Sequence, residues 1–86
     1  MSIDLWYLYV VKCSDETLYA GITTDPKRRL KEHNESSKGA KYTRSRRPVG
    51  NLVILGSFTM VGDALRAEKK FKSLSRREKI MHIRET

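Results

Sequence analysis

The stretch "WYLYVVKCSDETLYAGITT" occupies residues 6–24 and decides how the chain begins to fold. Apolar, aromatic and β-branched residues fill both of its ends, and this composition is typical of β-strands. Between the two ends, the polar segment "SDET" at residues 14–17 has the residue types of a turn. The sequence therefore predicts a β-hairpin with strands over residues 5–12 and 18–23.

Both faces of the first predicted strand are apolar. Successive side chains of a strand point to opposite faces, so a strand that is apolar on both faces is expected to be central or covered on both sides. Strand tyrosines usually pack with the hydroxyl at the rim, and periodicity alone gives those of this hairpin no other role. One face carries Leu5, Tyr7, Tyr9 and Val11, and the other carries Trp6, Leu8 and Val10.

The rest of the chain predicts helices around one further strand. Pro26 suits the first turn of a helix, where its missing N–H is not needed. Asp63 is a candidate cap, and Ser75 followed three residues later by Glu78 forms a capping box. The order β-β-α-β-α-α predicts an α+β domain over residues 1–86, a small three-stranded antiparallel sheet flanked by helices. The later elements are expected over residues 26–34 (helix), 51–58 (strand), 64–72 (helix) and from 75 through 83 (helix).

Charge is the first indication of function. The 86 residues include 18 Lys and Arg against 10 Asp and Glu, for a net charge of +8. Such a surface attracts nucleic acid, an anionic membrane or an acidic protein. The chain has no run of about 18 apolar residues, so we expect no membrane partner and favour nucleic acid. A protein-interaction module for an acidic partner and a basic surface without a partner remain alternatives.

The single cysteine, Cys13, excludes an internal disulfide, and only two histidines accompany it. A zinc site is therefore not expected, and the chain fits a reducing, cytoplasmic compartment. The N-terminus lacks the basic start of a signal peptide. Cys13 lies near a strand end, where a small buried or half-buried thiol is expected instead of a nucleophile.

Glu68 is the first candidate for chemistry. It falls three residues after Leu65 and three before Phe71, which places it on the apolar stripe of its helix. A carboxylate that points inward must be paired, hydrogen-bonded or bound to a metal. The alternative is a partly exposed Glu at the stripe edge that pairs with a nearby Lys or Arg.

Arg29 and His33 are four residues apart on the first helix and share a face, beside its apolar anchor Leu30. An arginine at this place can hold a phosphate, and a histidine can hold another or move a proton. A solvated basic helix face is the alternative.

The basic loop over residues 37–50 is the candidate binding surface. Basic side chains hold phosphates and an aromatic ring can stack on a base, although a flexible basic loop has the same composition. The candidate nucleic-acid-binding residues are Lys38, Lys41, Tyr42, Arg44, Arg46 and Arg47.

Together these residues resemble the GIY-YIG nuclease superfamily, and most closely its small standalone bacterial members. "YLY" at residues 7–9 and "YAG" at residues 19–21 match the family's two short tyrosine motifs on adjacent strands. An arginine on the first helix and a glutamate on a later helix match as well. Two positions depart from the family pattern, because Tyr7 stands where the first motif has glycine and Ala20 stands where the second has isoleucine.

The resemblance implies a divalent-metal-dependent endonuclease that cuts DNA with little sequence preference. Glu68 would bind the metal, Mg²⁺ or Mn²⁺, and Arg29 would neutralise charge on the phosphate. A tyrosine, Tyr9 or Tyr19, would activate or orient the attacking water. A free tyrosine has a pKa near ~10, so Arg29 and the metal would have to lower it. His33 would assist with a proton or a phosphate.

The resemblance also sets expectations for structure and partners. Gly21 would allow close backbone packing beside the site, and Tyr7 would be a neighbour of the site and not a catalyst. Many family nucleases carry an attached DNA-binding domain that selects the target, and we expect none in these 86 residues. We therefore expect a monomer whose targeting depends on a partner protein. A non-catalytic nucleic-acid-binding module with the same fold remains the alternative to an enzyme.

Overall fold

The computed structural model describes residues 4–35 and 38–85. The predicted order β-β-α-β-α-α is confirmed, and one short helix, α2, is added within the loop that follows α1. None of the helices in these ranges is long and apolar enough to cross a membrane. The elements are β1 (Trp6–Lys12), β2 (Leu18–Thr23), α1 (Pro26–Glu35), α2 (Lys41–Arg44), β3 (Gly50–Phe58), α3 (Val61–Lys72) and α4 (Arg76–Arg84).

The sheet is antiparallel with strand order β2-β1-β3, so β1 is the central strand, as its two apolar faces predicted. β1 pairs with β2 so that Tyr9 lies opposite Gly21 and Val11 opposite Tyr19. This register brings the two tyrosine motifs side by side. β2 is left at the edge of the sheet.

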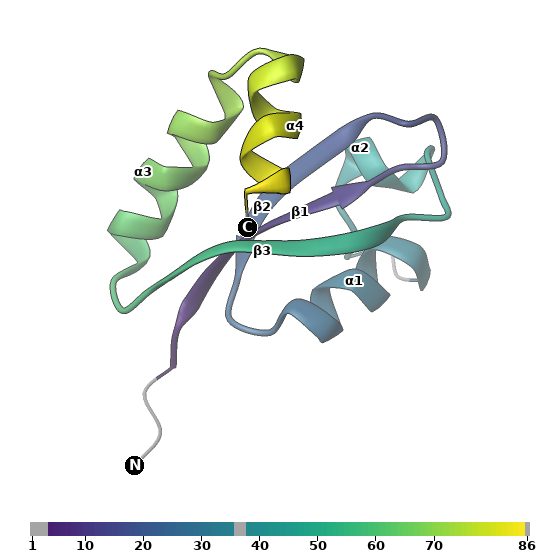
Figure 1. The fold of residues 1–86 in the computed structure, drawn as a ribbon. Coiled ribbons are helices and arrows are strands. Elements are labelled where there is room, and N and C mark those ends of the chain that lie inside the picture. Colours follow the sequence, from purple (N-terminus) through teal and green to yellow (C-terminus); the bar gives the residue numbers. More distant parts are fainter. Residues whose placement is uncertain (1–3, 36–37, 86) are drawn as a thin grey trace.

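Each face of the sheet is covered by a different pair of helices (Figure 1). On the α3 and α4 side, Leu8 and Val10 pack with Phe71 in one apolar cluster. On the α1 and α2 side, Tyr9 and Val11 belong to a second cluster. The alternation read from the sequence therefore divides β1 between two layers of core.

The helix ends have local causes. The Asp25 carboxylate accepts a hydrogen bond from the Arg28 amide at 3.1 Å, which caps the start of α1. The capping box of Ser75 and Glu78 is confirmed at the start of α4. The expected cap of α3 was wrong. Met60 is the N-cap and Asp63 lies within the first turn, where its charge still suits the helix dipole.

The hairpin turn holds a residue in the left-handed backbone region. Glu16 has a φ of 71°, which most residues avoid. The Cys13 amide donates to the Thr17 carbonyl at 2.8 Å and closes the turn. Cys13 is buried, as expected, and this burial raises the pKa of its thiol. The position therefore has the character of a packing residue.

Candidate active site

A chain of hydrogen bonds runs through the core between β1, α1 and α2. The Thr43 hydroxyl donates its only proton to the Ala40 carbonyl at 2.9 Å. Thr43 must therefore accept from His33 Nδ1, 2.8 Å away, which leaves Nε2 of the neutral imidazole without a proton. Nε2 lies 2.7 Å from the Tyr9 hydroxyl and accepts its proton. Thr43 thus fixes the His33 tautomer and, through it, the direction of the Tyr9 hydroxyl.

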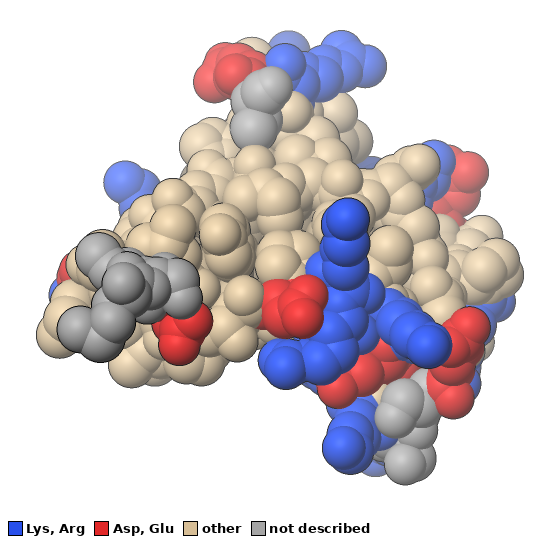
Figure 2. Space-filling view, turned by 90° about the horizontal axis from the view of Figure 1, so that it is seen from below, with Lys and Arg blue, Asp and Glu red and all other residues tan. Residues whose placement is uncertain are grey.

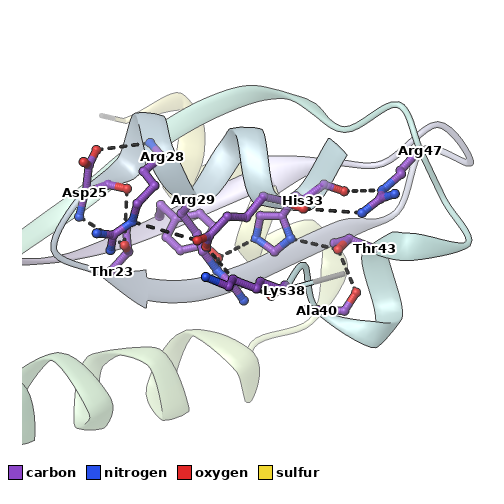
Figure 3. A network of polar contacts seen from close by, with 11 residues as sticks. Thr23, Asp25, Arg28, Arg29, His33, Lys38, Ala40, Thr43 and Arg47 are labelled. Atoms are coloured by element: carbon purple, nitrogen blue, oxygen red, sulfur yellow. Dashed lines mark hydrogen bonds and ion pairs between the residues drawn. The ribbon is translucent and has the colours of Figure 1, made fainter. Parts of the chain in front are cut away.

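Arg29 joins this hydrogen-bond network at the Tyr9 hydroxyl (Figure 3). Its Nε donates to the Tyr9 oxygen at 3.4 Å, and its Nη1 donates to Glu32 at 3.1 Å and to the Lys38 carbonyl at 2.9 Å. Its side chain keeps 23% of its surface exposed. The guanidinium is therefore held at three points while part of it remains available to a ligand.

Burial sets the protonation state of Tyr9 and His33, the two titratable side chains buried in this network. It raises the pKa of Tyr9 to about 12, although the hydrogen bond and charge of Arg29 lower it. It lowers the pKa of His33 to about 4, and the Arg29 charge adds to this effect. Arg29 thus lowers the Tyr9 pKa, as expected, but in the free protein desolvation has the larger effect and the pKa stays above its ordinary value. Both residues are neutral at pH 7.

Five predicted site residues lie around Tyr9. Besides His33 and Arg29, Tyr19 contacts the His33 ring that holds Tyr9, and the negative charge of Glu68 lies close enough to raise the Tyr9 pKa. Gly21 faces the same point. A Cβ at position 21 would lie 2.7 Å from the Tyr9 hydroxyl oxygen, so a side chain there would collide with it. The expected close packing at Gly21 is thus present, and its neighbour is the Tyr9 hydroxyl. Tyr7 lies two residues earlier on β1, opposite Thr23.

Tyr19 lies between the buried hydrogen-bond network and a surface cleft. Its ring meets the edge of the His33 ring, with centroids 5.2 Å apart, and stacks on Tyr42 at 5.9 Å. Tyr9 is only 1% exposed, whereas Tyr19 is half-buried and lines the cleft. Of these two tyrosines, Tyr19 is therefore the one that a ligand can reach. The cleft, of about 270 Å³, is lined by Leu18, Tyr19, Ala20, Tyr42, Phe71, Lys72 and Lys79.

Glu68 reaches the site from α3, on a buried stripe that differs from the expected one. Leu65 is 52% exposed and does not belong to it. Ala64 and Phe71 are buried and Ala67 is half-buried, so the stripe follows the i, i+3, i+7 spacing that includes Glu68 at i+4. The Glu68 side chain keeps 19% of its surface exposed and pairs with Lys72 at 2.7 Å. The structure thus matches the alternative of a partly exposed glutamate on the stripe that pairs with a nearby lysine.

The basic loop divides into structural and exposed residues. Arg46 stacks on Tyr42 at 3.8 Å and bonds Asp15 of the hairpin turn at 2.9 Å. Arg47 donates to the carbonyl of His33 at 2.5 Å. Basic and acidic side chains also stand side by side on the face seen in Figure 2. The exposed residues of this loop, which face solvent, are Lys38, Lys41, Tyr42 and Arg44.

Glu68 is the residue that could hold a divalent metal. Within residues 4–35 and 38–85, no group of three or more His, Cys, Asp or Glu side chains could form a metal cage. Mg²⁺ does not need one, because it commonly binds one or two carboxylates, water and substrate phosphates. The Lys72 ammonium already places a cation 2.7 Å from this carboxylate. Glu68 therefore fits a metal that is shared with a substrate phosphate and does not fit a tightly bound structural ion.

The sequence did not indicate two residues that hold the site together. Thr43 was one polar residue in a basic loop. Asn34 accepts from the Val49 amide at 2.7 Å and donates to the Val49 carbonyl at 2.8 Å. It ties the end of α1 to the chain before β3. Neither contact leaves a local pattern, because each joins segments far apart along the chain.

Comparison with known proteins agrees with this arrangement. A family model described as the GIY-YIG catalytic domain matches residues 5–81. The chain belongs to the GIY-YIG family. The matched range includes both tyrosine motifs, Arg29, His33 and Glu68. It places the chain in a family of nucleases.

Individual relatives extend over nearly the whole chain. The UPF0213 protein YazA of Bacillus subtilis is 48% identical over 85 residues, covering 99% of this chain and 84% of the relative. A UPF0213 protein of Streptococcus agalactiae is 51% identical over 79 residues, covering 92% and 88%. A UPF0213 protein of Syntrophus aciditrophicus is 46% identical over 79 residues, covering 92% and 90%. No solved structure matches the chain.

Proposed function

We propose that this GIY-YIG protein is a metal-dependent endonuclease that hydrolyses phosphodiester bonds in DNA with little sequence preference. One observation carries the proposal. The Tyr9 hydroxyl bonds His33 and Arg29, Tyr19 contacts the His33 ring, and the Glu68 charge acts on Tyr9, so residues from four separate elements surround one point. A binding module needs exposed cations and has no use for a buried, directed network behind a single arginine.

The buried hydrogen-bond network of Tyr9, His33 and Thr43 acts by positioning Arg29. Tyr9 and His33 are almost fully buried, so neither is the group that touches the substrate first. Their hydrogen bonds fix the oxygen that accepts from Arg29 Nε. A preorganised guanidinium can stabilise negative charge as it develops on a scissile phosphate without reorganising at that moment.

Tyr19 and Glu68 complete the site. Tyr19 lines the cleft and is placed to orient an attacking water through its hydroxyl. Glu68 would hold the metal, which when bound would polarise the phosphate and stabilise the leaving oxygen. The exposed loop cations would contact phosphates, which position a nucleic acid without reading its sequence. This gives the expected low sequence preference, and target choice would come from a partner protein.

Cleavage of plasmid and labelled oligonucleotides with Mg²⁺ or Mn²⁺ tests the proposal. Glu68→Ala and Arg29→Ala should each lower the cleavage rate about 100-fold or more, since each removes charge stabilisation at the reacting phosphate. Arg28→Ala is the matched control, because Arg28 is exposed on the same helix. Circular dichroism checks the fold of each variant. Equal cutting by all four proteins would contradict the proposal and indicate contamination.

A non-catalytic nucleic-acid-binding module is the second candidate. The ion pair between Glu68 and Lys72 favours it, because the carboxylate that would hold the metal is already neutralised. This candidate predicts salt-sensitive binding and no cleavage with any divalent metal. The same cleavage series, run beside a binding assay, separates the two.

A further inference from the structure

Lys72 lies between the proposed metal ligand and the surface cleft. Its ammonium is 2.7 Å from the Glu68 carboxylate, one helical turn earlier on α3. The same ammonium is 5.8 Å from the centre of the Tyr19 ring, and Lys72 lines the cleft beside it. One side chain is therefore within reach of two different anionic partners: the Glu68 carboxylate and any phosphate that enters the cleft.

The Glu68–Lys72 pair is easily exchanged. Half of the Lys72 side-chain surface is exposed, and exposed pairs of this kind contribute little to stability. A lysine is also a flexible point charge that can move between acceptors without matching a fixed geometry. Holding Glu68 thus does not prevent Lys72 from leaving when a stronger anion arrives.

Glu68 by itself is a weak metal site. No cage of three or more metal-ligating side chains exists in the described part of the chain, and a divalent cation must also displace Lys72. A phosphate in the cleft changes both conditions. It attracts the lysine away from the carboxylate, and its oxygens can become further ligands for the metal.

We propose that Lys72 exchanges partners when nucleic acid binds. In the free protein Lys72 forms an ion pair with Glu68. In the complex it binds a backbone phosphate in the cleft, and the Glu68 carboxylate then binds the divalent cation. Metal and nucleic acid then bind with positive coupling, because each removes an obstacle to the other. The inference rests on the proposed function for its metal and its substrate, and it adds Lys72 as a residue that binds the nucleic-acid backbone.

Mn²⁺ binding to the free protein, followed by electron paramagnetic resonance, tests the exchange without any cleavage. Lys72→Met should bind Mn²⁺ about two- to fivefold more tightly than wild type, because it removes a weak competitor from Glu68. Glu68→Gln should lose this binding. Lys70→Met is the matched control, since Lys70 is an exposed lysine on the same helix, and it should behave as wild type.

A second measurement follows DNA binding in EDTA by fluorescence anisotropy. Lys72→Met should weaken binding more than Lys70→Met, because Lys72 lines the cleft and Lys70 does not. Equal Mn²⁺ affinity of Lys72→Met and wild type would overturn the inference, as would equal effects of the two lysine variants on either measurement. Unchanged Mn²⁺ binding by Glu68→Gln would overturn it too, since the metal would then lie elsewhere.

The two proposals fail in different ways. Neither measurement involves cleavage, so an inactive wild-type protein that still shows the Lys72 effects would refute the nuclease and support the exchange. An active wild-type protein whose Lys72→Met variant binds Mn²⁺ unchanged would refute only the exchange. Circular dichroism of both exposed-lysine variants confirms that they remain folded.

Discussion

Three polar side chains share the interior of this small protein, and each depends on the next. Tyr9, His33 and Thr43 are all at most 1% exposed, and their hydrogen bonds run in one direction toward the Ala40 carbonyl. A buried donor without a partner is costly, so this network is stable only when every member is satisfied. The network therefore has two roles. It stabilises part of the fold, and it fixes the position of Arg29 through the Tyr9 hydroxyl.

Replacing Thr43 should break the network at its fixed end. Thr43→Val keeps the shape of the side chain but leaves the His33 Nδ1–H without an acceptor. We expect a loss of about 1–3 kcal/mol in the free energy of unfolding, measured by urea denaturation. Thr43→Ser keeps the hydroxyl and should lose less than half of that. Equal losses in the two variants would show that the methyl group, and not the hydrogen bond, carries the effect.

His33 should make stability depend on pH in a defined window. Its pKa falls to about 4 in the folded protein because of burial, against about 6.5 when unfolded. Below pH 6.5 the unfolded chain binds a proton that the folded chain does not. Stability is therefore fully present above pH 6.5 and falls as the pH drops toward 4, by about 3 kcal/mol from this residue.

Urea denaturation of wild type and His33→Gln between pH 7 and pH 4 measures this contribution. Glutamine is neutral at every pH in this range and can hydrogen-bond. The free energy of unfolding of the variant should therefore fall much less than that of wild type as the pH drops. The lowered pKa values of Asp15 and Glu78 act in both proteins and cancel in the comparison. Parallel pH profiles for the two proteins would refute a neutral, buried His33.

At the scale of elements, the sequence predicted well what local interactions decide. The hairpin, the division of β1 between two faces and the capping box at Ser75 depend on neighbouring residues. The start of α3 and the helix α2 were missed, because tertiary contacts stabilise a start without a capping side chain and a helix of four residues. Leu65 suggested the inward side of α3 although it points outward, and the two small residues Ala64 and Ala67 form the real stripe.

The hairpin turn contains a strained residue that can be relieved. Glu16 has a φ of 71°, a region that costs most residues energy and glycine almost none. Glu16→Gly should raise the free energy of unfolding by about 0.5–1 kcal/mol, after the larger entropy cost of glycine. The ion pair with Lys12 that it removes is largely exposed and contributes little.

Thermal or urea denaturation checks the Glu16 prediction. Asn51→Gly is the matched control, because Asn51 has a φ of 52° but asparagine tolerates this region. The gain at position 51 should therefore be smaller. A loss of stability in Glu16→Gly would mean that the side chain contributes more than its backbone strain costs.

At the scale of the whole molecule, residue types were predictable and their partners were not. The motif spacing pointed to Tyr9, Tyr19, Arg29, His33 and Glu68, and the structure brings these together. The links between them join segments far apart in sequence, such as Tyr9 with His33 and Arg46 with Asp15. The charge pattern likewise did not separate the structural arginines Arg46 and Arg47 from the exposed cations of the loop.

The net charge of +8 should appear as strong salt dependence of nucleic-acid binding. Each lysine or arginine that neutralises a phosphate releases counterions, so the affinity falls as salt rises. Fluorescence anisotropy in EDTA over a salt series should show a linear decline of log affinity with log salt.

The double variant of Lys41→Ala and Arg44→Ala should flatten the slope by about 2, because it removes two exposed loop cations. Arg66→Ala, on α3 and paired with Asp63, should leave the slope unchanged. If the loop variant keeps the wild-type slope while the affinity remains salt-dependent, nucleic acid binds on another face of the molecule.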